Sequence, residues 1–425
     1  MASASQIDAT CRSNSVFRTS TPGRFCERPL HLLYLTYAYL PTLGGTQRSV
    51  YNLADKFVCR GHRVTIATNG DELNYSGDLP IPVLTLPIPT PIPHSTADIV
   101  KLSTQDPINI RALAALCEKN QIDLVHCHLV NVDTRYAIAL KRLLGIKMIL
   151  TLRGGEFHHW IEGRPRRRAY VAEMLERADY ITALSQSQVN DAQILVPDRA
   201  WSDCSEVICN PVDADAIAKW ADSGEHFYQN GRSYVVFCGR LENEKRVDTL
   251  IEAYHGIIAQ CPDFPHELIV VGDGSLLPTL TAQAGNGPGA ERIRFLGACR
   301  YEDTLALIRG AAILVLPSLY EGCPNAVLEA MALGTPVIVS DAAGLRELVT
   351  QGVNGDIFPA GDASALAPCL QSLSRDPGRL CLYTAAGKRR IADNHQFDQI
   401  AMAYERVYGM LTGHRVPHHR MKQSG

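Results

Sequence analysis

The chain has 425 residues, about three times the commonest domain size, which predicts two domains or more. Hydrophobic residues make up 46% and charged residues 20%, an ordinary globular composition that excludes a collagen-like or wholly disordered chain. The 41 basic and 44 acidic residues give a net charge of -3, so the chain lacks the basic excess of a dedicated nucleic-acid-binding protein.

The thirteen cysteines are scattered, and no two of them form a CxxC pair. This pattern predicts neither a zinc site nor a disulfide framework, so we expect free thiols in a reducing compartment. No segment approaches the roughly 20 uninterrupted apolar residues of a membrane-spanning helix. The expected location is therefore cytoplasmic.

Residues 1–29 are rich in Ser, Thr and Arg and contain no apolar run. This composition is typical of a disordered tail. Organellar transit peptides share it, but the segment has no clear amphipathic helix, so we prefer a plain linker or a mis-assigned start codon.

A first α/β domain is expected over residues 30–212. The apolar run 30–37, a glycine-containing loop, a helical pattern to about residue 60 and a strand over 62–68 form a βαβ unit. Further strands over 123–127, 147–152 and 180–183 alternate with helices over 110–119 and 132–144. Alternation indicates a doubly wound parallel sheet. We expect the proline-rich residues 80–93 to interrupt it as an extended surface connection.

The alternation starts afresh after a polar region at residues 224–232, which predicts a second domain over residues 213–390. Its expected strands are 234–238, 267–271, 293–295, 313–316 and 336–339, and its expected helices are 247–259, 301–309, 326–333 and 363–373. Two doubly wound domains create a cleft that the carboxyl ends of both strand sets face. Ligand chemistry is expected in that cleft.

The segment LVLPSLYEGCPNAVLEAMALGTPVIVSD, residues 314–341, is the most informative. A buried strand leads into a loop with Glu321 and then into a helix with Glu329, so both carboxylates can face one crevice, one for a sugar and one for a ribose. Alone, such a pair would more often be surface charges. Free amides at the start of the helix suit a phosphate group. The loop and helix start supply the candidates Gly322, Cys323, Pro324 and Asn325.

A second motif, FCGRLENEKRVDTLIEAY at residues 237–254, favours the ligand-site interpretation of the two glutamates over the surface-charge one. It places Arg240 and Lys245 just after a strand that ends at the same crevice. Two fixed cations can neutralise a departing diphosphate without a metal ion. The alternative is a cluster of surface ion pairs with Glu242 and Glu244, which would contribute little.

With these motifs the chain resembles glycosyltransferases of family four over about residues 30–408, and this implies the GT-B architecture of two Rossmann-like domains around a nucleotide-sugar cleft. The resemblance implies that Glu321 contacts the donor sugar, Glu329 holds the ribose hydroxyls, and Arg240 and Lys245 bind the diphosphate. Such enzymes retain anomeric configuration and usually need no metal or other cofactor. It further implies a helix within residues 391–411 that packs back on the first domain, before a mobile tail at 412–425. Glycine contacts to the donor are implied for Gly44, Gly45, Gly272 and Gly274.

The acceptor side of the resemblance is looser. DLVHCHLV places His126 and His128 at a strand end, and TLRGGEFHHW places Arg153 and Gly154 after the next strand. For the two histidines, a packing role is about as consistent as a site role. Arg153 stands where many relatives carry a histidine, and a permanent cation there could serve an anionic acceptor or the diphosphate.

Two charged segments have alternative interpretations. Asp213 and Asp215 form a D-x-D, but they precede a helix where Asp is a common N-cap, so no metal site is predicted. A cluster of arginines on a helical segment is either a solvated face or a contact for a charged acceptor or anionic lipid head groups at the inner membrane surface. This cluster consists of Arg164, Arg166, Arg167 and Arg168.

We therefore expect a retaining glycosyltransferase that moves a hexosyl unit from a nucleotide diphosphate sugar to a saccharide or lipid-linked saccharide, in polysaccharide or glycoconjugate biosynthesis. The EGCPN sequence favours UDP-sugars over GDP-sugars, by resemblance only. The alternatives are a nucleotide-sugar epimerase or hydrolase on the same fold, and a non-catalytic carbohydrate-binding protein.

Overall fold

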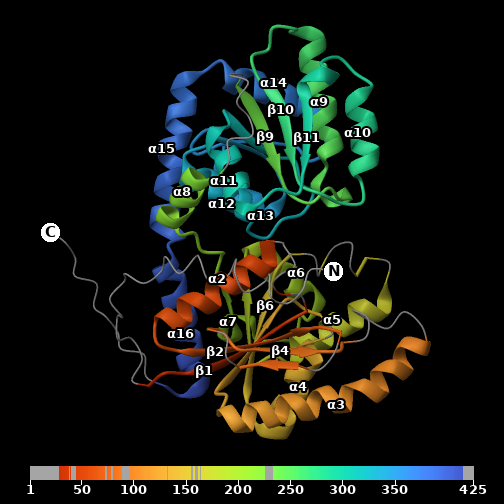
Figure 1. Ribbon diagram of the computed structural model, residues 1–425, viewed down its shortest axis with the longest axis vertical. Coiled ribbons are helices and arrows are strands. Elements are labelled where there is room, and N and C mark those ends of the chain that lie inside the picture. The colour runs from red at the N-terminus through yellow and green to blue at the C-terminus, as the bar shows by residue number, and fades with distance from the viewer. Residues whose placement is uncertain are drawn as a thin grey trace, which may run out of the picture.

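The computed structural model describes most of the chain, and its elements form two α/β domains that lie one above the other along the long axis of the molecule (Figure 1). The described residues are 28–37, 39, 45–71, 74–77, 80–88, 96–131, 133–154, 157, 161–162, 164–224 and 233–414.

The first domain contains an eight-stranded sheet in the order β3-β4-β2-β1-β5-β6-β7-β8, and its neighbouring strands are parallel except for β3 and β4. The strands β1, β5 and β7 are buried along their whole length, which explains their nearly continuous apolar sequences. The strands are β1 (His31–Thr36), β2 (Arg63–Asn69), β3 (Asn74–Ser76), β4 (Val83–Leu86), β5 (Leu124–His128), β6 (Lys147–Leu152), β7 (Tyr180–Ala183) and β8 (Ser205–Val207). The helices are α2 (Gly45–Cys59), α3 (Thr96–Asn120), α4 (Thr134–Leu144), α5 (Pro165–Arg177), α6 (Gln186–Leu195) and α7 (Trp201–Cys204).

The proline-rich segment differs from the expectation. Within it, β4 joins the sheet as a parallel neighbour of β2, with Ile66 opposite Val83. Pro82 and Pro87 flank these four residues, so neither removes an N–H donor from the strand itself. The Pro82 carbonyl even accepts a bond from the Ile66 amide at 2.8 Å. The prediction of a surface connection is therefore wrong for residues 83–86, and residues 89–93 lie outside the described residues.

The second domain contains a six-stranded parallel sheet in the order β11-β10-β9-β12-β13-β14. Its strands are β9 (Tyr234–Cys238), β10 (Glu267–Val271), β11 (Ile293–Gly297), β12 (Ile313–Leu316), β13 (Val337–Ser340) and β14 (Asp356–Phe358). Its helices are α8 (Ala214–Ser223), α9 (Val247–Gln260), α10 (Leu277–Gly285), α11 (Tyr301–Gly310), α12 (Asn325–Leu333), α13 (Ala343–Leu348), α14 (Ala363–Ser374) and α15 (Pro377–Asn394), with short 3₁₀ turns η1 (Asn243–Lys245) and η2 (Ala290–Arg292). Helices cover the sheet on both faces (Figure 1), which is the arrangement that an all-parallel sheet requires.

The chain crosses between the domains twice, before α8 and after α15. The two crossings run side by side, because the Val212 amide donates a hydrogen bond to the His395 carbonyl at 2.8 Å. After the second crossing, α16 (Phe397–Thr412) lies against α2 and the first sheet (Figure 1).

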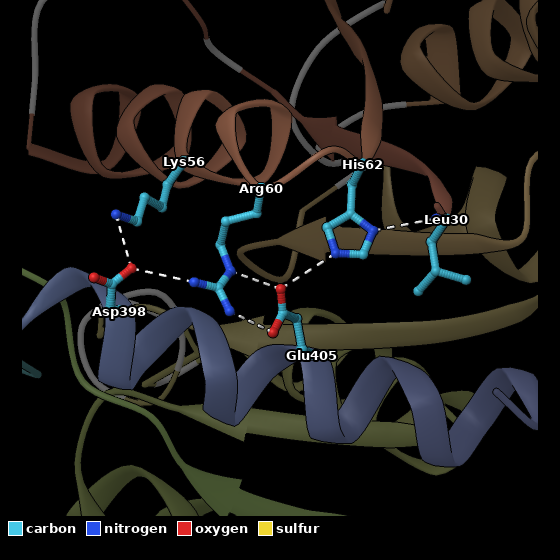
Figure 2. A network of polar contacts seen from close by, with 6 residues as sticks. All are labelled: Leu30, Lys56, Arg60, His62, Asp398 and Glu405. Atoms are coloured by element: carbon cyan, nitrogen blue, oxygen red, sulfur yellow. Dashed lines mark hydrogen bonds and ion pairs between the residues drawn. The ribbon is translucent and has the colours of Figure 1, made fainter. Parts of the chain in front are cut away.

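A buried ion pair holds α16 in this position (Figure 2). Arg60 donates from Nε and Nη2 to the two carboxylate oxygens of Glu405, at 2.7 and 2.8 Å. The Leu30 amide donates to Nδ1 of His62, so the proton of that ring is on Nε2, which donates to Glu405 at 3.2 Å. Burial alone would raise the pKa of Glu405, but the hydrogen bonds from Arg60 and His62 outweigh it and lower that pKa.

The structure corrects the expectation about cysteines. Cys209, on the first crossing, forms a disulfide with Cys323 on the loop before α12. The partners are 114 residues apart, so no local spacing marks them, and the prediction that the cysteines form no disulfide is wrong for this pair. Among the described residues, no helix is both long and apolar enough to cross a bilayer.

Candidate active site

The loop between β12 and α12 carries the first glutamate of the E-x7-E motif and ends in a helix N-terminus. Pro324 is the N-cap residue of α12, one position before the helix begins. The amides of Asn325 and Ala326, in the first turn, have no hydrogen-bond acceptor among the described residues. Their free N–H groups and the helix dipole favour an anion at this position.

The structure brings Glu321 together with Lys245. Lys245 Nζ donates to Glu321 Oε1 at 2.5 Å, and Ser318 Oγ donates to the same oxygen at 2.8 Å. The side chains of Lys245 and Glu321 are 16% and 11% exposed, so both are largely shielded from solvent but reachable. The Leu319 amide donates to the Glu244 carbonyl at 2.7 Å, which fixes the two loops beside each other.

Arg240 takes a different position. Its Nη2 donates to Glu244 at 2.8 Å, and its side chain is 71% exposed. Glu242 instead accepts hydrogen bonds from the amide and hydroxyl of Ser275. The surface ion-pair interpretation thus describes the position of Arg240 in the structure. Because an exposed pair contributes little stability, an anionic ligand can replace Glu244 as the partner of Arg240 at low cost.

The glycine turn after β10 packs against the loop that carries Arg240. Gly272 has φ +136°, and a Cβ there would lie 1.8 Å from the Gly239 carbonyl oxygen. A Cβ on Gly274 would lie 2.5 Å from the Leu241 carbonyl oxygen. Only glycine fits these two positions, and their close approach fixes the path of the Arg240 loop.

Glu329 lies in a buried network of its own. Its side chain accepts a hydrogen bond from the Tyr301 hydroxyl at 2.8 Å. Burial raises the pKa of Glu329, with partial compensation from this bond and from the Arg48 charge. Arg48, on α2 of the first domain, stacks on the Tyr301 ring with its guanidinium carbon 3.6 Å from the ring centroid. A cavity between the domains is lined in part by Arg48, Val212, Trp220, Tyr301, Asn325 and Glu329.

A chain of hydrogen bonds connects the acceptor-side candidates to the donor loop. Arg153 donates to Nδ1 of His128 at 2.9 Å and to Oδ1 of Asn210 at 3.1 Å. Asn210 Nδ2 donates in turn to the Cys323 carbonyl at 2.9 Å and to Asn325 Oδ1 at 3.0 Å. Asn210, in the NPVD turn between the domains, therefore joins the two halves of the site.

The same chain of bonds extends to the start of α2. Asn325 Nδ2 donates to the Gly45 carbonyl at 3.2 Å and to Ser49 Oγ at 3.1 Å. The structure therefore brings Gly45 to the donor loop. Gly44 lies outside the described residues.

The two strand-end histidines have different roles. His126 is fully buried, and its ring nitrogens bond to the hydroxyls of Tyr408 at 2.8 Å and Thr151 at 2.6 Å. No ring nitrogen of His126 is left for an acceptor, so the packing interpretation describes it. His128 accepts the Arg153 bond through Nδ1, which places its proton on Nε2, a buried atom with no partner among the described residues. Burial lowers the pKa of His128 well below its usual value, and His126 and Arg153 add to this effect.

Glycines allow close packing around Glu321, both between the two domains and within the second one. Gly154 has φ +128°, and a Cβ there would lie 3.6 Å from the Gly322 amide nitrogen. A Cβ on Gly322 would lie 2.7 Å from the Gln188 side chain, and one on Gly344 would lie 2.2 Å from the Glu321 carbonyl oxygen. Larger residues at Gly322 and Gly344 would push these segments apart.

Glu347 and Asp213 both bind the N-terminus of a helix. Glu347 accepts bonds from the amides of Gln186 and Ser187, at 2.7 and 2.9 Å, at the start of α6 in the other domain. Asp213 accepts from the Ala216 amide at 2.9 Å, which confirms the N-cap interpretation of the D-x-D sequence.

The arginine cluster lies at the N-terminus of α5. Its first turn contains no acidic residue, although acidic side chains are the ones that stabilise this end of a helix. Arg164 and Arg168 are exposed and line an open hollow of about 630 Å³, whose other lining residues include Glu162, Phe157, Ile161 and Tyr320. Tyr320 precedes Glu321, so the hollow adjoins the donor loop.

Sequence reasoning missed several residues of the site. Asn210 carries a local signal, because an amide side chain at the turn between the domains can reach both of them. No local sequence signal marks the other missed residues, which are Arg48, Gln188 and Tyr301. They lie on helices, and only the tertiary structure shows which helix faces contact the site.

Comparisons with known proteins agree on one kind of enzyme. A family model described as Glycosyltransferase Family 4 matches residues 43–216, and one described as Glycosyl transferases group 1 matches residues 232–376. Glycogen synthase of Mycobacterium tuberculosis is 29% identical over 70% of this chain and 72% of its own length. Phosphatidyl-myo-inositol mannosyltransferase of Mycobacterium leprae is 28% identical over 86% of this chain and 92% of its own length.

Solved structures show the same fold. Sucrose-phosphate synthase from Thermosynechococcus elongatus superimposes with a TM-score of 0.73 at 20% identity, over 90% of this chain and 99% of that chain. Anabaena HepE, in complex with UDP-glucose, gives a TM-score of 0.70 at 18% identity, over 90% of this chain and 100% of that chain. With its two parallel-sheet domains and the two family-model matches, this chain is a glycosyltransferase that belongs to glycosyltransferase family four and has the GT-B fold.

Proposed function

We propose that this enzyme moves a hexosyl unit from a nucleotide diphosphate sugar to a saccharide or lipid-linked saccharide, with retention of anomeric configuration. The observation that carries the proposal is the Lys245 and Glu321 pair beside the free amides at the start of α12. An ammonium group and peptide N–H donors are suited to a diphosphate, and a carboxylate is suited to sugar hydroxyls.

In the proposed mechanism the departing diphosphate is stabilised by Lys245, Arg240 and the helix amides. As the bond between the anomeric carbon and the diphosphate oxygen breaks, the sugar gains oxocarbenium character. The acceptor oxygen attacks from the same face, and its proton passes to the departing diphosphate oxygen. Glu321 orients the sugar, and Glu329 holds the ribose hydroxyls. No enzyme nucleophile and no divalent ion is required, so turnover should persist when magnesium and manganese are omitted.

A UDP-sugar is the preferred donor in this proposal. Two proteins that share the fold use uridine nucleotides: HepE has been crystallised with UDP-glucose, and the trehalose-phosphate synthase of Burkholderia xenovorans is UDP-forming. The EGCPN loop of this chain supports the same choice by resemblance. A thermal-shift screen of UDP, GDP and ADP tests it, because a ligand at a hundredfold excess over its Kd raises the free energy of unfolding by about 2.7 kcal/mol.

The arginine cluster supports an anionic acceptor, such as a phosphate-linked saccharide. The arginines lie at the N-terminus of α5, where the positive end of the helix dipole repels them. An anion bound there would be attracted by both the arginines and the helix dipole. The adjoining hollow falls within the range of about 300–1,000 Å³ that is usual for small-molecule sites. Transfer to phosphate-bearing and neutral acceptors, compared in wild type and in the Arg164→Ala and Arg168→Ala variants, tests this part.

The main test measures donor turnover and nucleotide binding in Lys245→Met and Arg240→Ala variants. Both variants should lose donor turnover while they remain folded by far-ultraviolet circular dichroism. Lys119→Met is the matched control, because Lys119 is exposed in the last turn of α3. Unchanged donor turnover in both folded variants would overturn the proposal. Release of free monosaccharide or its epimer as the sole product, with acceptors present, would favour the hydrolase or epimerase alternative.

A further inference from the structure

Three metal-ligating side chains meet where the two interdomain crossings contact the donor loop. Cys209 lies on the first crossing, Cys323 precedes α12, and His395 follows α15 on the second crossing. Their ligand atoms all lie within 4.8 Å of one another. Within the described part of the chain, this is the one group of three or more His, Cys, Asp or Glu side chains that could hold a metal ion.

The imidazole of His395 is positioned as a ligand. Its Nδ1 lies 3.3 Å from the Asn210 carbonyl oxygen, which can only accept, so the ring proton is on Nδ1 and the lone pair on Nε2. His395 is 3% exposed, and Nε2 is buried without a hydrogen-bond partner among the described residues. Metal-bound histidines characteristically donate their other ring N–H to a carbonyl or carboxylate in this way.

Two thiolates and an imidazole form a ligand set suited to Zn²⁺. Bond lengths of about 2.0–2.3 Å place the ligand atoms of a tetrahedral zinc site about 3.3–3.8 Å apart. The three ligand atoms here lie within 4.8 Å of one another, and the two sulfurs, which are bonded to each other in the disulfide, must move apart after reduction to reach this spacing. Cys323 is 3% exposed, so the site is shielded from bulk solvent. The disulfide uses the same two sulfurs, so the disulfide and a bound metal exclude each other.

We propose that the reduced protein binds Zn²⁺ through Cys209, Cys323 and His395, with a fourth position open to water. A two-electron reductant of the dithiol class converts the disulfide to two thiols and itself becomes a disulfide. Zn²⁺ then displaces one proton from each thiol and accepts the Nε2 lone pair. The disulfide links only the first crossing to the donor loop, whereas the bound ion links both crossings to it, the second one through His395. The zinc inference does not depend on the proposed glycosyl transfer, although Cys323 lies on the donor loop.

The test measures zinc in the full-length protein. Wild type is reduced with a phosphine, equilibrated with zinc sulfate and freed of excess ion by gel filtration. We expect about one Zn²⁺ per chain, retained by wild type and lost in the Cys209→Ser, Cys323→Ser and His395→Ala variants. Cys381→Ser is the matched control, because Cys381 is exposed and free, and it should keep the zinc. Circular dichroism establishes that each variant is folded.

A second measurement identifies the ligands directly. Cobalt(II) added to the reduced wild type should produce the intense visible bands of a tetrahedral site and the near-ultraviolet thiolate charge-transfer band. With cobalt(II) kept in excess, so that the weakened sites of the variants stay partly occupied, the thiolate band should weaken in Cys209→Ser, and the visible bands should change in His395→Ala. The inference is overturned if reduced wild type retains no more zinc than Cys323→Ser. It is equally overturned if the disulfide of the folded protein resists reduction.

Discussion

Replacing Glu405 by glutamine should lower the free energy of unfolding by about 3 kcal/mol. The Glu405 and Arg60 side chains are 4% and 9% exposed, so the substitution leaves a buried guanidinium without its main counter-charge. Removing one partner of a buried pair costs about 3–5 kcal/mol. We expect the lower end of this range, because Asp398 still lies 3.2 Å from Arg60.

Urea unfolding followed by far-ultraviolet circular dichroism measures this effect. At a slope of about 3 kcal/mol per molar urea, the midpoint should fall by about 1 M. Glu173→Gln is the control, because its pair with Arg177 is exposed on α5 and should contribute only about 0.3–0.5 kcal/mol. The double variant Arg60→Met, Glu405→Leu should recover much of the loss, since it leaves no buried charge unpaired. Equal midpoints for Glu405→Gln and Glu173→Gln would refute this reasoning.

Four further outcomes are expected. Glu321→Gln should reduce kcat more than it weakens nucleotide binding, whereas Glu329→Gln should do the reverse, as steady-state kinetics and calorimetric titration with UDP would show. The lowered pKa of Glu405 means that its contribution to stability is present above its unfolded pKa, near 4.5, and is lost as the pH falls through the folded value. Acid unfolding of Glu405→Gln should accordingly show less pH dependence than that of wild type. Asn210→Ala should lower kcat/KM without abolishing nucleotide binding, because it breaks the hydrogen-bond chain between the domains; an unchanged kcat/KM would contradict this. Asp213→Ala should cost about 1 kcal/mol as a lost N-cap and leave turnover without added metal unchanged.

The buried central strands of each sheet could be predicted from the sequence. Strands such as β6, β7, β9 and β10 have the bounds expected from their apolar runs, because a strand covered on both faces must be apolar along its length. The strand β4 was missed because prolines on both sides hid a run of only four residues. The three-residue strands β3, β8 and β14 are too short to show any period.

The E-x7-E and Arg240 to Lys245 motifs were readable from sequence because each follows one strand directly. Local geometry alone places such residues at the carboxyl edge of a sheet. The partners that the structure gives them were not readable. Lys245 and its partner Glu321 are 76 positions apart in the sequence, and Tyr301 and its partner Glu329 are 28 positions apart.

The contacts between the two domains could not be predicted from the sequence. The Cys209 to Cys323 disulfide, the Asn210 hydrogen bonds and the stacking of Arg48 on Tyr301 all join segments that are distant in the chain. The tertiary structure also gives the two neighbouring histidines different roles. His126 bonds to Tyr408 in the interior, whereas His128 contacts Arg153. Apolar patterning and turn residues act over a few positions and so specify single elements, whereas contacts between domains depend on which faces pack together once each sheet has formed.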